Sequence, residues 1–90
     1  MTSTIPAAEG AEPQGRVTTL DLRGLNSPLP ALRAGKALRR LAPGDLLIVS
    51  CTDPLASIDI PHLVNETGDA LEGQDAHDGE TTFRIRRRRR

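Results

Sequence analysis

Residues 21–30, DLRGLNSPLP, form the stretch whose residue types and spacing best fit a reactive site. Gly24 suits a tight turn, and Ser27 followed by Pro28 is typical of a helix start. Ser27 is then expected as the N-cap and Pro28 at the first helical position. The side chain at position 27 would lie at the positive end of a helix dipole, close to an exposed loop. This is a place for an anion or for an activated nucleophile, and the sequence puts a serine there.

Other residues that could do chemistry are better interpreted as structural. A catalytic serine needs a positioned base, and the chain has no Gly-x-Ser-x-Gly elbow, so Ser27 is interpreted as a helix cap. Cys51 is the single cysteine and lies at a strand end, where it could replace a missing thiol. We interpret it instead as a buried, inert strand residue. Asp53 and Asp59 are interpreted as helix caps rather than as acids or bases.

A metal site is not expected. The chain has two histidines, His62 and His77, interpreted as surface residues of a helix and of a hairpin. Their spacing from Asp75 and Asp78 matches no known ligand pattern. We therefore predict neither a metal nor another cofactor.

The composition indicates what kind of domain positions these residues. The chain has 90 residues, 37% of them hydrophobic, with one Phe and neither Trp nor Tyr, which predicts one domain with a small aliphatic core. One cysteine rules out an internal disulfide. No apolar run approaches the roughly 20 residues that span a bilayer, and the N-terminus resembles no secretory leader. We expect a soluble cytoplasmic protein with no membrane contact.

Charge is balanced overall, with Lys+Arg 12 and Asp+Glu 12, but its distribution is uneven. Half of the basic residues lie between residues 84 and 90. The basic C-terminal tail, residues 87–90, could be solvated, could contact tRNA weakly, or could dock an acidic patch on a partner. A second basic group, a possible docking face for a partner protein, lies on a predicted helix and comprises Arg33, Lys36, Arg39 and Arg40.

The spacing of apolar residues predicts the helices and strands of the first half of the chain. Residues 1–15 show no period and are expected to be a disordered tail. Residues 16–22 favour a strand, and residues 28–41 favour a helix because Ala31, Ala34, Leu38 and Leu41 make one apolar stripe. The apolar run 46–51 predicts a central strand.

The second half of the chain again predicts a helix followed by strands. Asp53 and Pro54 predict another helix start, with a kink or restart near Asp59 because Pro61 follows, and an end at Thr67-Gly68. Residues 70–77 favour a polar edge strand. Asp78-Gly79 predicts a type I′ turn into the last strand.

This order, βαβαββ, predicts a right-handed parallel crossover followed by an antiparallel hairpin. Two helices can cover one face of a four-stranded mixed sheet. The predicted fold class is therefore an α/β (α+β) two-layer sandwich over residues 16–86.

Four motifs together resemble the TusA/SirA family of small sulfur carriers, or sulfurtransferases, over residues 17–86. They are DLRGLNSPLP at 21–30, Pro43-Gly44-Asp45, Thr52-Asp53-Pro54 and Asp59-Ile60-Pro61. The resemblance implies the same βαβαββ sandwich. It also implies a carrier cysteine in a Cys-Pro-x-Pro motif that takes persulfide sulfur from a cysteine desulfurase or another donor. The acceptor would be a sulfur-relay protein or a tRNA-modifying enzyme, or would serve molybdenum cofactor or sulfur oxidation. The motif residues that would support the site are Arg23, Gly24, Asn26, Pro28, Pro30, Asp53 and Asp59.

The chain departs from the family at the carrier position, which is Ser27. A thiol at a helix N-terminus has a pKa lowered to about 3.5–7.5 in known cases. A serine oxygen is not ionised at neutral pH and cannot hold a persulfide, so this chain is expected to be inactive in persulfide transfer. It is either an engineered Cys-to-Ser variant, which the fit of the other motifs favours, or a natural inactive relative. The alternative function is a non-catalytic protein- or RNA-binding module that uses the same basic face and the arginine tail.

Overall fold

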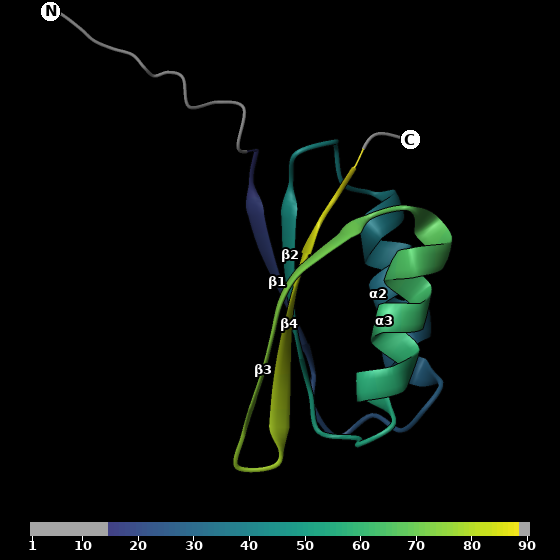
Figure 1. Ribbon diagram of the computed structural model, residues 1–90, viewed down its shortest axis with the longest axis vertical. Helices are drawn as coiled ribbons and strands as arrows, with labels where there is room; N and C mark the ends of the chain where they lie inside the picture. The colour runs from purple at the N-terminus through teal and green to yellow at the C-terminus, as the bar shows by residue number, and fades with distance from the viewer. Residues whose placement is uncertain (1–14, 89–90) are drawn as a thin grey trace, which may run out of the picture.

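The computed structural model describes residues 15–88 as a four-stranded sheet with both helices packed on one of its faces (Figure 1). The predicted sandwich and its βαβαββ order are confirmed. The elements are β1 (Val17–Leu22), α2 (Leu29–Arg39), β2 (Leu46–Cys51), α3 (Ala56–Thr67), β3 (Ala70–His77) and β4 (Glu80–Arg86).

The sheet has the order β1-β2-β4-β3. β1 is parallel to β2, and β4 is antiparallel to both β2 and β3. The apolar run of β2 is therefore central and β3 is an edge strand, as predicted. Asp78 and Gly79 both have positive φ, 50° and 79°, as the predicted type I′ turn requires.

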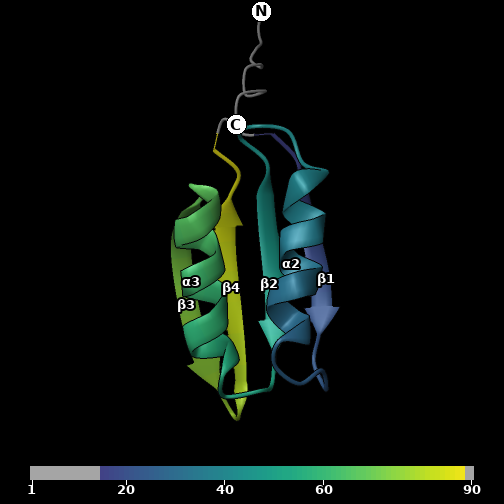
Figure 2. The ribbon, with the colours of Figure 1, turned by 90° about the vertical axis from the view of Figure 1, so that its right-hand side faces the viewer.

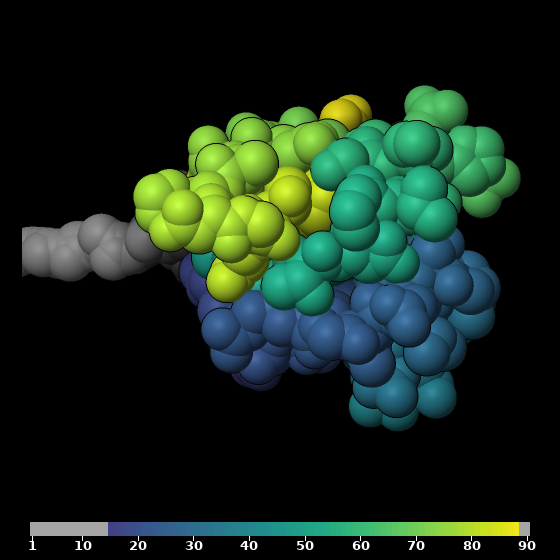
Figure 3. Space-filling model, turned by 90° about the horizontal axis from the view of Figure 1, so that it is seen from below, coloured from purple at the N-terminus to yellow at the C-terminus, as the bar shows by residue number. Residues whose placement is uncertain are grey.

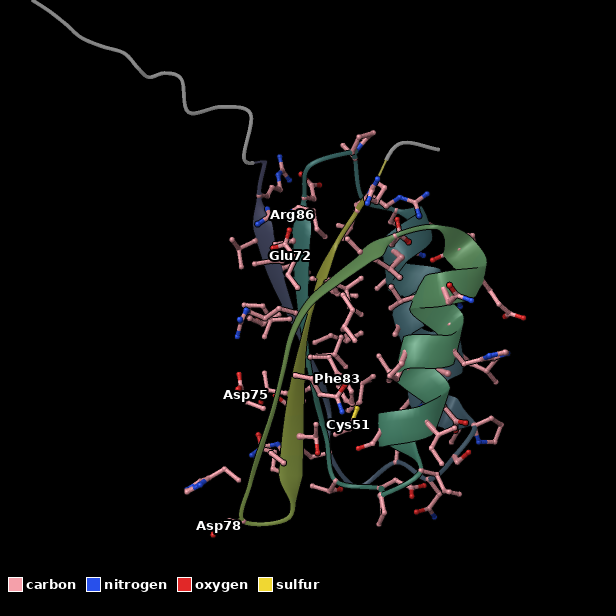
Figure 4. All side chains as sticks on the ribbon, viewed as in Figure 1. Cys51, Glu72, Asp75, Asp78, Phe83 and Arg86 are labelled. Atoms are coloured by element: carbon pink, nitrogen blue, oxygen red, sulfur yellow. The ribbon has the colours of Figure 1, made fainter. Side chains whose placement is uncertain are left out.

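The core fills the space between the sheet and the helices (Figure 2). Phe83 and Cys51 lie in this layer, whereas Glu72, Asp75 and Arg86 lie on the other side of the sheet (Figure 4). This alternation follows from the two-residue period of a strand. The buried apolar residues are Leu22, Ala34, Leu38, Leu47, Val49, Cys51, Ala56, Ile60, Val64, Phe83 and Ile85.

The predicted restart of the second helix is wrong. α3 runs without a break from Ala56 to Thr67 with Pro61 inside it, and ends at Gly68 in the left-handed conformation as predicted. Asp59 is already in the helix, because its N–H donates to the carbonyl of Leu55 at 2.9 Å. Pro61 removes one backbone hydrogen bond, but packing of the neighbouring Ile60 and Val64 into the core keeps the helix continuous.

The ordered domain extends past residue 86. Arg87 exchanges backbone hydrogen bonds with Gly44 and Asp45, each 2.8 Å long. Its guanidinium lies 3.1 Å from Asp69, whose side chain is fully buried. Arg87, predicted to start the tail, is thus bonded into the fold. The remainder of the predicted tails, residues 1–14 and 89–90, lies outside the described residues.

Candidate functional site

The candidate site lies at the end of the molecule where both helices begin. β1 and β2 are parallel, so the loops that follow them, residues 23–28 and 52–55, both begin at the carboxyl ends of the strands, at the same end of the sheet. Figure 3 looks onto this end, where the blue residues before α2 lie against the teal residues at the start of α3. The N–H of Gly24 donates to Oγ1 of Thr52 at 2.8 Å and joins the two loops.

Ser27 is held between two carboxylates of the second loop and its helix. Its N–H donates to Oδ2 of Asp53, and its hydroxyl donates to Oδ2 of Asp59, both at 2.5 Å. The residue is half-buried. Ser27 is therefore fixed by α3 and the loop before it, rather than by the helix that it precedes.

The prediction that Ser27 caps the first helix is wrong. The N-cap of α2 is Pro28, and no side chain accepts a hydrogen bond there. Pro28 and Pro30 have no N–H, and the N–H of Leu29 donates to the carbonyl of Asn26 at 2.9 Å. The group of free helix-end amides expected to face position 27 is thus largely missing. Carboxylates face Ser27 instead.

Asp53 bridges the two loops. Its Oδ1 accepts the N–H of Leu55 at 3.0 Å, while its Oδ2 accepts that of Ser27. These two bonds lower the pKa of Asp53 below its usual value, because they stabilise the carboxylate. The N-cap of α3 is Leu55, so Asp53 caps the turn before the helix and not the helix itself. Asp59, predicted as a cap, lies inside the first turn of α3.

Among the other motif residues, Arg23 does not reach Ser27. Its guanidinium pairs with Asp21 at 2.8 Å and lies 3.8 Å from Glu80. The side-chain hydrogen bonds from Arg23 lower the pKa of Asp21 to about 2. Gly24 has φ 86°, which favours glycine. Pro30 is buried, whereas Asn26 is exposed and contributes its backbone carbonyl.

Cys51 is the last residue of β2 and has 1% of its surface exposed, which confirms that it is a buried strand residue. Burial, and to a lesser extent the charge of Asp53, raises the pKa of the Cys51 thiol to about 11. A buried thiol that stays protonated at neutral pH is a poor nucleophile. Cys51 is therefore not a substitute for a thiol at position 27.

The structure also shows an exposed apolar surface beside Ser27, which the sequence analysis missed. Four large side chains at the starts of the two helices are exposed: Leu29, Leu32, Leu55 and Ile58. Leu32 and Ile58 are exposed by 62% and 65%, respectively. A signal for this surface was present, since Leu32 and Ile58 fall outside the apolar stripes that predict the core.

The basic residues of α2 face solvent as predicted, but they do not form one group. Arg33, Lys36 and Arg40 line a groove beside β1. The guanidinium of Arg39 instead lies near Gly35, which packs against Leu63 of α3. The four residues thus divide between two flanks of the helix.

The histidines are exposed and lie in separate pairs. His62 is 3.3 Å from Glu66 within α3, and His77 is 3.3 Å from Asp78 at the hairpin. Among residues 15–88 we find no group of three or more His, Cys, Asp or Glu side chains that could hold a metal ion. No helix in this part of the chain is both long and apolar enough to cross a membrane.

Comparisons with known proteins give one consistent result. Residues 18–87 match the family described as sulfurtransferase TusA. The sulfur carrier protein TusA of Pseudomonas entomophila is 40% identical over 70 residues, which cover 78% of this chain and 88% of that protein. TusA of Allochromatium vinosum is 38% identical over 68 residues, covering 76% and 90% of the two chains. A candidate sulfur carrier of Neisseria meningitidis is 43% identical over 65 residues, covering 72% and 88%.

Proposed function

We propose a function for this chain from one premise: it belongs to the TusA family of sulfurtransferases, whose relatives named above include sulfur carriers. Its proposed role is to present the Ser27 end of the domain to a sulfur-donor protein, such as a cysteine desulfurase, and then to a sulfur acceptor. The acceptor would belong to tRNA thiolation, molybdenum cofactor synthesis or sulfur oxidation, and the cytoplasm is the compartment that we propose for the relay. With Ser27 in place, the chain docks but does not carry sulfur.

The observation that supports this proposal is that position 27 holds a hydrogen-bonded serine hydroxyl and no thiol. Ser27 is half-buried and its hydroxyl already donates to Asp59, and the single thiol of the chain is buried elsewhere. In persulfide transfer, a carrier thiolate attacks the outer sulfur of the donor persulfide. A new S–S bond forms, the old one breaks, and its electron pair leaves with the donor cysteine. Ser27 offers no such thiolate at neutral pH.

The surroundings of Ser27 suit a protein partner. The exposed side chains Leu29, Leu32, Leu55 and Ile58 surround the helix starts on either side of it. Apolar side chains grouped in this way on a small domain are typical of a protein interface. A donor that covers them would bring its persulfide to position 27.

The test is a transfer assay with a cysteine desulfurase and ³⁵S-labelled cysteine. Ser27→Cys is expected to acquire label that reducing agent releases, whereas the present chain and Ser27→Ala acquire none. The Ser27→Cys, Cys51→Ala double variant shows whether the label lies at position 27. Failure of the folded double variant to accept label would overturn the proposal, as would equal labelling of the present chain.

A second candidate function is a binding module that transfers nothing, favoured by the unpaired basic residues on α2. Arg33, Lys36 and Arg40 make no side-chain hydrogen bond or ion pair within residues 15–88. Binding to RNA would weaken steeply with salt. It would persist with Ser27 and fall on removal of residues 88–90. This candidate would be excluded if the chain binds no RNA, or if its RNA binding changes neither with salt nor on removal of residues 88–90.

A further inference from the structure

A groove of about 370 Å³ lies between α2 and the outer edge of β1, away from Ser27. Its floor is apolar and comprises Leu20, Ala37 and Leu41. Its rim is cationic and comprises Arg33, Lys36 and Arg40. Because no acidic side chain in the described chain pairs with these three residues, the rim carries uncompensated positive charge.

The strand beside this groove is an open edge of the sheet. The carbonyl of Arg16 accepts the N–H of Leu46 in β2, so alternation turns the backbone groups of Val17, Thr19 and Asp21 outward. These groups have no backbone partner in the described residues. Figure 2 shows β1 at the margin of the sheet with α2 in front of it.

The two edges of the sheet differ in how they resist pairing. β3 is interrupted by an irregularity between Leu71 and Gly73, and its Glu72 and Asp75 form ion pairs with β4. Bulges and charges are common means of protecting an edge strand. β1, with the sequence VTTLDL, has neither proline nor bulge, and its one charge is Asp21. β1 is therefore the edge open to an additional strand.

We propose that an extended acidic segment of a partner protein binds at this edge as a fifth strand beside β1, with its acidic side chains against the rim of the groove. Alternate residues of such a segment face the helix layer and are about 6.6 Å apart. Lys36 follows Arg33 by three residues and precedes Arg40, the C-cap of α2, by four, or about 4.5 and 6 Å along the helix axis. Acidic residues at every second position therefore have a spacing close to that of Lys36 and Arg40, and long side chains can make up the difference at Arg33. A peptide fits better than RNA, because the open edge also needs backbone donors and acceptors.

The proposal can be tested with the labelled peptide TEVEVET, whose three Glu residues alternate, and with TKVKVKT as its control. TEVEVET is expected to bind and to shift the amide NMR signals of Val17, Thr19 and Asp21, while TKVKVKT does not bind. Two further peptides carry N-methyl groups on either the Val or the Glu residues. One of them should lose binding and the other keep it, because only alternate N–H groups face β1. Loss with methylated Val indicates antiparallel addition, and loss with methylated Glu indicates parallel addition.

A matched pair of variants distinguishes peptide binding in the groove from a general effect of the charge of the protein. Lys36→Glu is expected to weaken TEVEVET binding by about tenfold, because it places a like charge in the rim. Arg39→Glu makes the same charge change on the other flank of α2 and is expected to change binding by less than about twofold. Thermal melting of both variants checks that they fold.

Three results would overturn the proposal. One is equal binding of both N-methylated peptides, and another is equal weakening by Lys36→Glu and Arg39→Glu. The third is a twelve-residue oligouridine that displaces the peptide and binds more tightly than it does, which would make the groove a polyanion site. None of these measurements uses Ser27, so they are independent of the proposed function.

Discussion

The hydroxyl of Ser27 donates a 2.5 Å hydrogen bond to the carboxylate of Asp59, which lies in the first turn of the other helix. This contact joins the loop before α2 to α3. It also means that the chemistry of position 27 depends on a side chain 32 residues away. The positive end of α2 is only one part of the electrostatic environment there, and a carboxylate opposes it.

Asp59 is therefore expected to raise the pKa of a thiol at position 27 and so to lower its reactivity at neutral pH. In the Ser27→Cys, Cys51→Ala variant, adding Asp59→Asn should lower the pKa of the new thiol by about one unit, because a nearby negative charge disfavours the thiolate. Iodoacetamide would then react several times faster at pH 7. Glu66→Gln, an exposed acid two turns further along α3, serves as the control. Unchanged reactivity after Asp59→Asn would show that the carboxylate does not set the state of position 27.

Cys51 is expected to be protected in the folded protein. Ellman's reagent at pH 8 should leave it unmodified under native conditions and modify it fully in denaturing urea. Because its folded pKa, about 11, exceeds the ordinary 9.0, the unfolded chain loses this proton first as pH rises. Stability should therefore fall between about pH 9 and 11, and Cys51→Ala should flatten that part of the profile. Rapid modification of the native chain would contradict the burial of Cys51.

Acid should destabilise the domain in part through Asp45. This buried carboxylate accepts the N–H groups of Arg16 and Ala42, both at 3.0 Å, and these bonds lower its pKa below the ordinary 3.8. Its contribution to stability is complete above pH 3.8 and is lost as pH falls through the lower folded value. Asp45→Asn should therefore melt below the unmodified chain at pH 7. The two melting temperatures should converge below pH 3.8, and parallel melting curves would refute this assignment.

Substitution of Arg87 should lower the free energy of unfolding substantially. The side chain of Asp69 is fully buried and that of Arg87 is 13% exposed, so Arg87→Met leaves a buried carboxylate without its cation. The expected loss is about 3 kcal/mol, typical of a broken buried pair. Arg88→Met serves as the control, because only the backbone N–H of Arg88 contacts Asp69. Urea unfolding of the two variants measures the difference. Equal midpoints would show that the pair contributes little.

Most of the fold follows from local patterns in the sequence. The apolar run of β2, the alternation in β4 and the Asp78-Gly79 turn each predict one element, and the structure confirms them. The errors occur where contacts between distant residues decide the outcome. Ser27 has the residue type of a cap, but Asp59 accepts its hydroxyl and the helix starts later. Arg87 belongs to a charge run, but Asp69, a buried acid just before β3, binds it. Neither partner can be identified by spacing along the chain.

The parallel course of β1 and β2 has a consequence for simultaneous occupancy. β2 begins at Leu46, next to the turn that binds Arg87, and ends at Cys51, two residues before the aspartate that holds Ser27. Six strand residues, or about 20 Å, thus separate the two poles of the domain. The groove of Arg33, Lys36 and Arg40 lies along the flank between α2 and β1, and Ser27 is not among the residues that line it. We therefore expect a segment bound in this groove and a partner bound at the Ser27 end to be held together, because they would contact different residues.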